Sequence, residues 1–197
     1  MHNLKDIFGL VASVFVIIGP VLYLRGVFNN TVKPHAFSWF VWGATLATGF
    51  GIQVSAGAGA GAWSTGIGAL SCAVIFFLAL KKSDRTFNVF DWACLIGAGC
   101  SFVLWRVTNQ PTAAAVLLSL TDTLGFLPTF RKGYRRPDED GLTPFTYGGI
   151  GTIFALVALE HVSLATWLYP ATIVASNAVF VVMILRRRRT TEARTAR

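Results

Sequence analysis

Charged side chains are scarce in this sequence of 197 residues, since Asp, Glu, Lys and Arg together make up only 13% of it. A soluble domain usually has about a quarter of its residues charged. The charged residues here are concentrated in short segments between apolar blocks, and no polar segment is long enough for a separate soluble domain. The composition therefore excludes a soluble globular protein and favours an integral membrane protein.

Residues that catalyse reactions or bind metals are scarce as well. The three cysteines, Cys72, Cys94 and Cys100, all fall in apolar blocks, and their spacing is not that of a disulfide framework or a zinc site. We interpret them as small buried side chains. The H-E-x-x-H, G-x-S-x-G, C-x-x-C and phosphate-loop patterns are absent from the sequence. We therefore expect no enzyme activity, no bound cofactor or metal, and no nucleotide site.

Long apolar blocks are what the sequence does contain. A helix that crosses the hydrocarbon core of a bilayer needs about 20 mostly apolar residues. Seven blocks suit this role: Leu4–Leu24, Ala36–Val54, Trp63–Leu80, Asn88–Arg106, Ala113–Phe130, Thr143–Leu159 and Thr166–Leu185. No A-x-A-like cleavage site follows the first block, so we expect it to be a span rather than a signal peptide. The expected fold class is an all-α integral membrane protein with seven transmembrane helices.

The basic residues lie almost entirely on one side of the predicted membrane. Fifteen of the 17 Lys and Arg residues fall in the segments after the first, third, fifth and seventh blocks, and only Lys5 and Arg106 fall on the other side. Because short cytoplasmic segments are enriched in Lys and Arg, we expect a cell (inner) membrane protein with the N-terminus outside and the C-terminus in the cytoplasm. We interpret Arg186–Arg189 as a contact for anionic lipid headgroups rather than for nucleic acid.

The two halves of the chain are related by a shift of 108 residues. This shift aligns Pro20 with Pro128, Phe37 with Phe145, Ser38 with Thr146, Trp39 with Tyr147, and Gly43 with Gly151. It also aligns the first three apolar blocks with the last three. We therefore expect a first three-helix repeat at 1–82, a linker span at 83–110, a second repeat at 111–189, and a basic cytoplasmic tail at 190–197. A single linker span makes the repeats parallel, so we expect two parallel three-helix bundles.

This 3+1+3 layout, with a proline near the end of the first helix of each repeat, resembles the SWEET and PQ-loop superfamily of small-solute transporters. The Pro-Gln dipeptide of that superfamily is absent, because Val21 and Thr129 follow the two prolines. SWEET proteins also resemble this chain in having an asparagine on the last helix of a repeat, which Asn177 matches and Ala69 does not. The resemblance implies a transporter whose solute binds between the repeats.

Asp122 is the only acidic residue deep in any apolar block, and Asn177 lies at a similar depth. Each stands nine residues before an arginine that marks the end of its block, Arg131 or Arg186. A helical rise of about 1.5 Å per residue places both near the middle of the bilayer. Ionisable residues there usually face a partner or a wet cavity. We interpret Asp122 and Asn177 as solute-binding candidates, and the alternative is that they only join helices by hydrogen bonds.

Aromatic and hydroxyl residues near the starts of the second and sixth blocks are further candidates for solute binding. They are Ser38, Trp39, Trp42, Thr146 and Tyr147. Flat rings could stack on a sugar, a vitamin or a nucleoside-like ring, although Trp39 and Tyr147 also suit the aromatic belt at the membrane surface. Pro20 and Pro128 are candidate hinges or plain helix terminators, because proline removes a backbone hydrogen bond.

These features predict a transporter of a small polar metabolite that works by alternating access between the repeats. The alternative is a scaffold or sensor that keeps the duplicated fold without a pathway. Expected partners are the solute and membrane lipid, not nucleic acid, and assembly into a homo-oligomer is left open. The position equivalent to Asp122 in the first repeat is Val14. We therefore expect a lopsided site in which Asp122 makes the key polar contact and is a candidate proton carrier.

Overall fold

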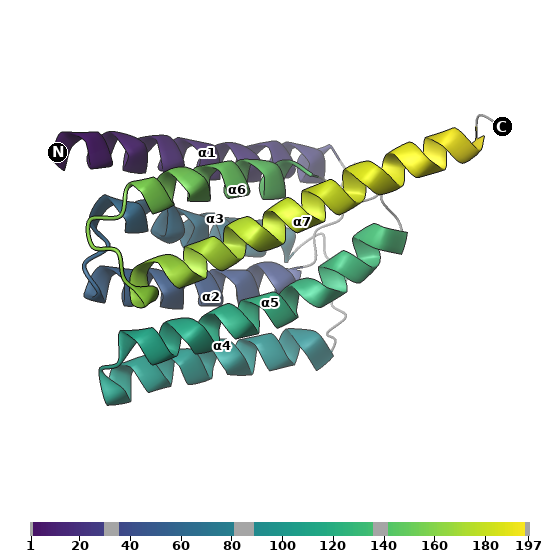
Figure 1. Cartoon of the computed structure of the whole chain (residues 1–197). Coiled ribbons are helices and arrows are strands. Elements are labelled where there is room, and N and C mark those ends of the chain that lie inside the picture. Colours follow the sequence, from purple (N-terminus) through teal and green to yellow (C-terminus); the bar gives the residue numbers. More distant parts are fainter. Residues whose placement is uncertain (1, 30–35, 81–88, 136–141, 196–197) are drawn as a thin grey trace.

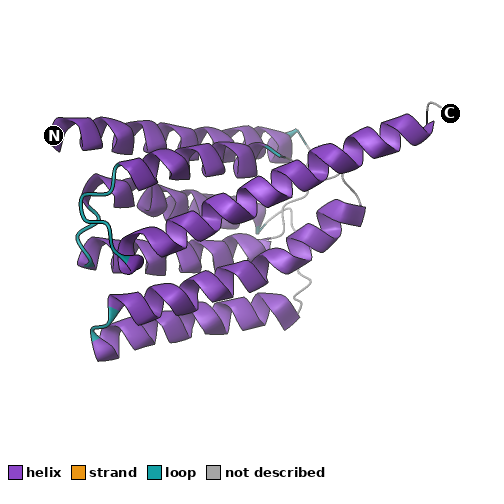
Figure 2. Ribbon diagram, in the orientation of Figure 1, coloured by secondary structure: helices purple, strands orange, loops and turns teal. Residues whose placement is uncertain are grey.

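The computed structural model describes residues 2–29, 36–80, 89–135 and 142–195. These ranges consist of helices joined by short connections and contain no strand (Figure 2). The elements are α1 (His2–Phe28), α2 (Ala36–Ser55), the short 3-10 helix η1 (Gly59–Ala62), α3 (Trp63–Ala79), α4 (Val89–Thr108), α5 (Pro111–Arg135), α6 (Thr143–Val157) and α7 (Leu164–Thr195). The all-α prediction is confirmed for the described residues.

Each predicted apolar block corresponds to one of the helices α1 to α7. The largest differences are at the C-terminal ends of α1, α5 and α7, which continue to Phe28, Arg135 and Thr195. Lys and Arg have high helix propensity, so a helix can continue past the apolar block that starts it. The hydropathy pattern locates the part suited to a bilayer, and the helix itself is longer.

Four helical segments are long and apolar enough to cross a membrane by length and composition: Asn3–Phe28, Gly59–Leu78, Pro111–Arg135 and Leu164–Thr190. The apolar helices Trp92–Thr108 and Thr143–Val157 are shorter. In α2, which has 20 residues, Trp, Gly, Thr and Gln dilute the aliphatic side chains. Four candidate spans are therefore shown among the described residues, and seven spans stay a prediction.

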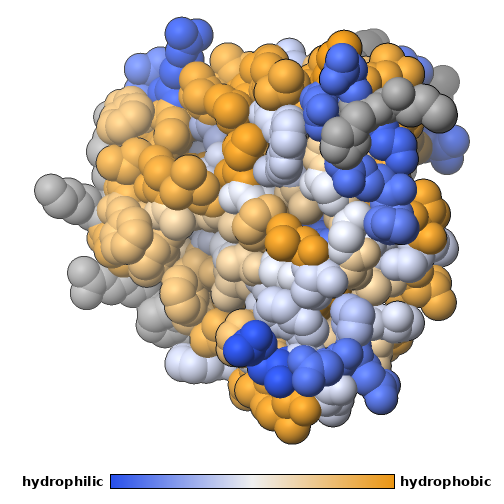
Figure 3. All heavy atoms as spheres, turned by 90° about the vertical axis from the view of Figure 1, so that its left-hand side faces the viewer, coloured by the Kyte–Doolittle hydropathy of each residue, from blue (hydrophilic) through white to orange (hydrophobic). Residues whose placement is uncertain are grey.

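Helices α1, α3, α5 and α7 run in one direction, and α2, α4 and α6 run in the opposite direction (Figure 1). The bundle therefore has two distinct ends. We call the end that holds the C-terminus the basic end, because Arg25, Arg131, Arg135 and Arg186–Arg189 lie toward it. We call the other end, with Lys5 and Arg106, the N-terminal end. Residues of intermediate hydropathy occupy much of the middle of the N-terminal end (Figure 3).

The order in which the helices pack positions the site. α3 packs against both α1 and α2, and α7 packs against both α5 and α6. The first three helices meet the last three mainly where α1 contacts α6, and to a smaller extent where α2 contacts α5. α4 packs against α5 and α2. We call the α1–α6 and α2–α5 contacts the two seams between the first three and the last three helices. The α2–α5 seam is the less extensive one.

Candidate functional site

Asp122 lies near the middle of α5, and only 6% of its surface is exposed. Its Oδ2 atom has no hydrogen-bond partner among the described residues. Burying a polar group without a partner costs roughly 1–3 kcal/mol, and a charged group costs more. Packing does not explain such a side chain, because an apolar residue would fill the same space without that cost. The unsatisfied oxygen makes Asp122 a candidate ligand-binding group.

Tyr169 of α7 packs on the N-terminal side of Asp122, against the preceding turns of α5. Its ring lies directly on Gly49 of α2, where an added Cβ would overlap the ring carbons Cε1 and Cδ1. The same added Cβ would come within 3.3 Å of Leu118 Cδ2 on α5. The absence of a side chain at Gly49 is therefore what lets the ring of Tyr169 lie between α2 and α5. The ring belongs to an apolar cluster with Ile52, Ala114, Ala115, Leu118 and Ala165.

The hydroxyl group of Tyr169 reaches toward the level of Asp122. It approaches the side chain of Thr45 and lies close enough to Asp122 and Cys72 for electrostatic interaction. The approach to Thr45 falls short of hydrogen-bond geometry, since the Tyr169 oxygen has no hydrogen-bond partner among the described residues. The Thr45 hydroxyl donates instead to the carbonyl oxygen of Trp42 at 3.0 Å.

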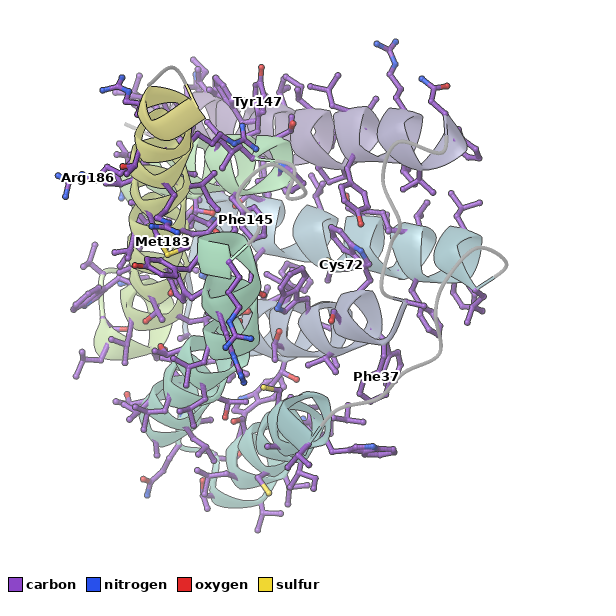
Figure 4. The ribbon with its side chains drawn as sticks, turned by 90° about the vertical axis from the view of Figure 1, so that its right-hand side faces the viewer. Phe37, Cys72, Phe145, Tyr147, Met183 and Arg186 are labelled. Atoms are coloured by element: carbon purple, nitrogen blue, oxygen red, sulfur yellow. The ribbon has the colours of Figure 1, made fainter. Side chains whose placement is uncertain are left out.

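Three aromatic rings meet on the basic side of Asp122. Trp42 of α2, Phe126 of α5 and Phe145 of α6 contact one another, with ring centroids 6.2, 6.2 and 6.1 Å apart. Phe126 follows Asp122 by one helical turn, so both side chains lie on the same face of α5. We call these rings the aromatic triangle. Viewed from the basic end, Phe145 and Cys72 lie between the helices, whereas Arg186 projects outward from α7 (Figure 4).

The register between α2 and α5 shows which residues lie at the same level of the bundle as Asp122. Trp42 meets Phe126, and Gly49 lies next to Leu118. Because the two helices are antiparallel, Thr45 and Asp122, which stand between these two contacts, lie at about the same level. Cys72 of α3 joins this level, since its Cβ lies 3.4 Å from the position of a Cβ added at Gly43. We call Thr45, Cys72 and Asp122 the polar layer.

Asn177 is also buried, with 6% of its surface exposed. Its Nδ2 atom lies 3.7 and 3.8 Å from the positions of Cβ atoms added at Gly148 and Gly149, so its side chain packs on α6. Asn177 follows Tyr169 by about two helical turns and shares its face of α7. The described hydrogen bonds do not join Asn177 to Asp122. A shared role for these two residues in binding one solute stays a prediction.

Trp39 and Tyr147, which the internal repeat aligns, have different surroundings. Trp39 is buried against Tyr23 of α1, with ring centroids 4.8 Å apart, and its Nε1 donates to the Tyr23 hydroxyl at 3.4 Å. Tyr147 stacks on Phe15 of α1 at 6.2 Å, in the α1–α6 seam. Burial does not fit the lipid-facing aromatic belt that was the alternative for Trp39. Trp42 is part of the aromatic triangle. Trp39 is not, but its ring contacts the Trp42 ring, with centroids 5.4 Å apart.

The remaining candidates lie nearer the basic end. Ser38 and Thr146 are half-buried in the first turns of α2 and α6. Pro20 lies inside α1, and Pro128 lies inside α5, which continues to Arg135. Neither proline ends its helix, so the interpretation of the two prolines as plain terminators is wrong. Their role as hinges stays a prediction.

Sequence reasoning missed Tyr169, Thr45, Phe126 and Phe145 as parts of the site. Tyr169 carries a usable signal, because a hydroxyl group inside an apolar block needs a partner just as a carboxylate does. The repeat gives no help for this residue, since its equivalent in the first half is Gly61. The sequence suggested a role for Phe145 only through its alignment with Phe37. Comparisons with family models, with curated proteins and with solved structures give no match for this chain.

Proposed function

We propose that this chain is a transporter that moves a small polar metabolite across a membrane by alternating access between two parallel repeats, α1–α3 and α5–α7, joined by α4. The observation that carries the proposal is the buried carboxylate of Asp122 in the middle of α5, whose Oδ2 atom has no hydrogen-bond partner among the described residues. It lies between two closures, Tyr169 on one side and the aromatic triangle on the other. A binding site enclosed from both ends is what alternating access requires of its closed state.

The packing order of the helices supports the two repeats. The third helix of each group packs against the first and the second, and the two groups meet through α1–α6 and α2–α5, which the shift of 108 residues exchanges. A parallel duplication related by an axis along the membrane normal places the site between the repeats, near the midplane. Asp122 and Thr45 occupy that position across the α2–α5 seam.

The difference between the seams supports a rocking motion. In the α1–α6 seam an added Cβ at Gly151 would lie 2.8 Å from the carbonyl oxygen of Ala12, so the backbones approach closely. Phe15 and Phe154 stack there with centroids 5.7 Å apart and an interplanar angle of 13°. In our proposal this tight seam is the axis of rotation, and the less extensive α2–α5 seam opens. Pro20 and Pro128 would then absorb the bending of α1 and α5.

The two closures connect the two halves in a way that suits this motion. Tyr169 of the second half lies on Gly49 of the first. The aromatic triangle joins Trp42 of the first half to Phe126 and Phe145 of the second. Rotation about the α1–α6 seam would separate one of these contacts while keeping the other. A scaffold would need neither closure, and a sensor could bind its ligand without a second closure, so we favour the transporter.

The charge distribution supports an orientation in a cell membrane with the basic end in the cytoplasm and the N-terminus outside. Arg186–Arg189 would then face anionic headgroups of the inner leaflet. A tag at the C-terminus that reacts with a membrane-impermeant reagent on intact cells would contradict this orientation.

The transport proposal is tested by substituting Asp122→Asn in protein reconstituted into liposomes. A thermal-shift screen against metabolite mixtures identifies ligands, because a solute that binds the native state raises its apparent stability. Uptake of the ligands found is then measured. We expect uptake by the wild type and loss of at least 90% of it in Asp122→Asn, since the key polar contact is removed. The matched control is Asp6→Asn, the same substitution near the N-terminal end, which should transport normally.

Three other results are informative. Unchanged uptake in Asp122→Asn, with the variant folded and inserted, would reduce Asp122 to a residue that holds helices together. Uptake by the wild type that depends on a pH gradient, and loses this dependence in Asp122→Asn, would identify Asp122 as the proton carrier. Uptake that is independent of a pH gradient would leave Asp122 as a solute ligand only.

A further inference from the structure

We propose that the site around Asp122 binds a small organic cation, meaning a positively charged nitrogen carried on an apolar or aromatic frame. This inference rests on the proposed function only for movement of the cation, and not for its binding. Three observations support it: the negative charge of the Asp122 carboxylate, the aromatic triangle one turn away, and the hydrogen bonds that the neighbouring hydroxyl groups donate to helix carbonyls.

Asp122 has no basic partner among the described residues. The nearest described basic residue along α5 is Arg131, nine residues away, which corresponds to roughly 13 Å along the helix. The other described basic residues lie toward the two ends of the bundle. A buried charge that lacks a partner is strongly unfavourable. A ligand with a positive charge would supply the missing partner, whereas an anion would be repelled by the carboxylate.

Aromatic side chains lie about one helical turn from the carboxylate. Phe126 lies one turn from Asp122 on the same face of α5 and contacts Trp42 and Phe145. The Trp42 and Phe145 rings are perpendicular, and those of Phe126 and Phe145 differ by 67°, so the triangle presents both ring faces and ring edges. A cation within about 6 Å of an aromatic face is attracted to it, most strongly at sites from which water is excluded. A carboxylate beside such rings favours an alkylated or aromatic ammonium.

The neighbouring hydroxyl groups disfavour a neutral polyol, because they have few donor hydrogens left for a ligand. A sugar site needs several hydrogen-bond donors and acceptors aimed at the ligand. Here the hydroxyls of Thr45, Thr48 and Ser119 donate to carbonyl oxygens of their own helices, at 3.0, 2.9 and 2.7 Å. Around the polar layer, the Tyr169 hydroxyl is the described one without a hydrogen-bond partner. One carboxylate and one phenol suit a single ammonium centre better than a ring of alcohol groups.

The proposal is tested with pairs of ligands that differ in charge but not in shape. Choline is compared with its neutral isostere 3,3-dimethyl-1-butanol, and 2-phenylethylamine with 2-phenylethanol, by calorimetry and thermal shift on the purified wild-type protein. We expect at least one cation to bind tenfold or more tightly than its neutral counterpart. Because this comparison uses the wild type, it holds even where a variant fails to fold. Equal binding within both pairs, or no binding of either cation, would overturn the proposal.

Variants then locate the binding. Asp122→Asn should weaken cation binding at least tenfold and leave the neutral isosteres unchanged, and Phe145→Leu should weaken the binding of 2-phenylethylamine. Asp6→Asn should bind as the wild type does. Unchanged cation affinity in folded Asp122→Asn would place the cation elsewhere and overturn the proposal.

A flux measurement separates this inference from the proposed function. A cation that binds with the expected selectivity but does not cross the bilayer of proteoliposomes supports the ligand class and contradicts transport. Uptake of a neutral solute that is lost in Asp122→Asn, without selective cation binding, supports transport and overturns the ligand class.

Discussion

At the scale of single residues, Gly49 and Tyr169 show how a missing side chain positions a large one. The Tyr169 ring occupies the space beside α2 that a side chain at residue 49 would take. Its hydroxyl is thereby directed into the interior, toward Thr45 and Asp122, where it has no hydrogen-bond partner among the described residues. The packing of the ring and the burial of the hydroxyl group therefore affect the stability of the protein in ways that can be measured separately.

The first prediction concerns the ring. Gly49→Ala should displace Tyr169 and lower the free energy of unfolding by roughly 1–3 kcal/mol, as overpacking in a filled core does. Thermal unfolding in detergent measures the change. The matched control is Gly99→Ala on α4, where an added Cβ meets nothing within 4 Å. That control should be neutral or slightly stabilising, because alanine has the higher helix propensity. A Gly49→Ala protein as stable as Gly99→Ala would contradict the packing of Tyr169 on α2.

The second prediction concerns the hydroxyl. Tyr169→Phe should keep or slightly raise the melting temperature, because it removes a buried hydroxyl that has no hydrogen bond. The same measurement on Thr166→Val should show a loss of roughly 1–2 kcal/mol, since Thr166 Oγ1 donates to the His161 carbonyl at 2.7 Å and accepts from the Ser163 amide at 2.9 Å. Marked destabilisation by Tyr169→Phe would mean that its hydroxyl has a partner in the folded protein.

At the scale of elements, the connections at the N-terminal end interlock the two halves. The Glu160 amide donates to the Ala58 carbonyl at 3.1 Å, which joins the α6–α7 connection to the α2–η1 connection. That turn contains two glycines with positive φ, Gly57 and Gly59, and the Glu160 side chain packs on Gly59. Lys5 of α1 adds hydrogen bonds from its Nζ to the carbonyl oxygens of Leu159, at 2.6 Å, and Glu160, at 3.2 Å.

The third prediction follows from Lys5, whose ammonium satisfies carbonyl groups just beyond the C-terminal end of α6. Lys5→Met keeps the length of the side chain and removes the charge and the donors, so we expect a loss of about 1 kcal/mol of stability. Chemical or thermal denaturation at low and high salt measures it. The control is Arg106→Met at the same end, because Arg106 lies over the neighbouring Trp105 ring at 5.7 Å within its own helix. Equal effects of the two substitutions would argue against a specific role for Lys5.

At the scale of the whole molecule, the two seams between the halves differ in extent, and this difference suggests which of them could open. The α1–α6 contact is extensive, and glycines bring its backbones close together, whereas the α2–α5 contact is smaller and encloses the polar layer. If the repeats rock, a constraint in the first seam should be tolerated, and a constraint in the second should stop the cycle.

The fourth prediction tests this with cysteine pairs in a protein whose native cysteines are replaced. A cross-link between positions 15 and 154, where Phe15 and Phe154 stack at 5.7 Å, should leave uptake within about twofold of the reduced protein. A cross-link between positions 52 and 115, where Ile52 and Ala115 share an apolar cluster, should abolish uptake until the bond is reduced. Each reduced sample is its own control. Full uptake with the second cross-link would exclude opening of the α2–α5 seam.

The sequence by itself determined the helical class, the approximate helix bounds and the position of Asp122 near the middle of its helix, because hydropathy is a local property. Only the tertiary structure decided that Oδ2 of Asp122 has no partner among the described residues, that the Tyr169 ring packs on Gly49, and that Trp42, Phe126 and Phe145 converge. These facts depend on the register between helices far apart in the chain. Trp39 and Tyr147 show the same limit. Alignment by the repeat makes them equivalent, yet α6 packs closely on α1 while α2 packs less on α5, so their surroundings differ.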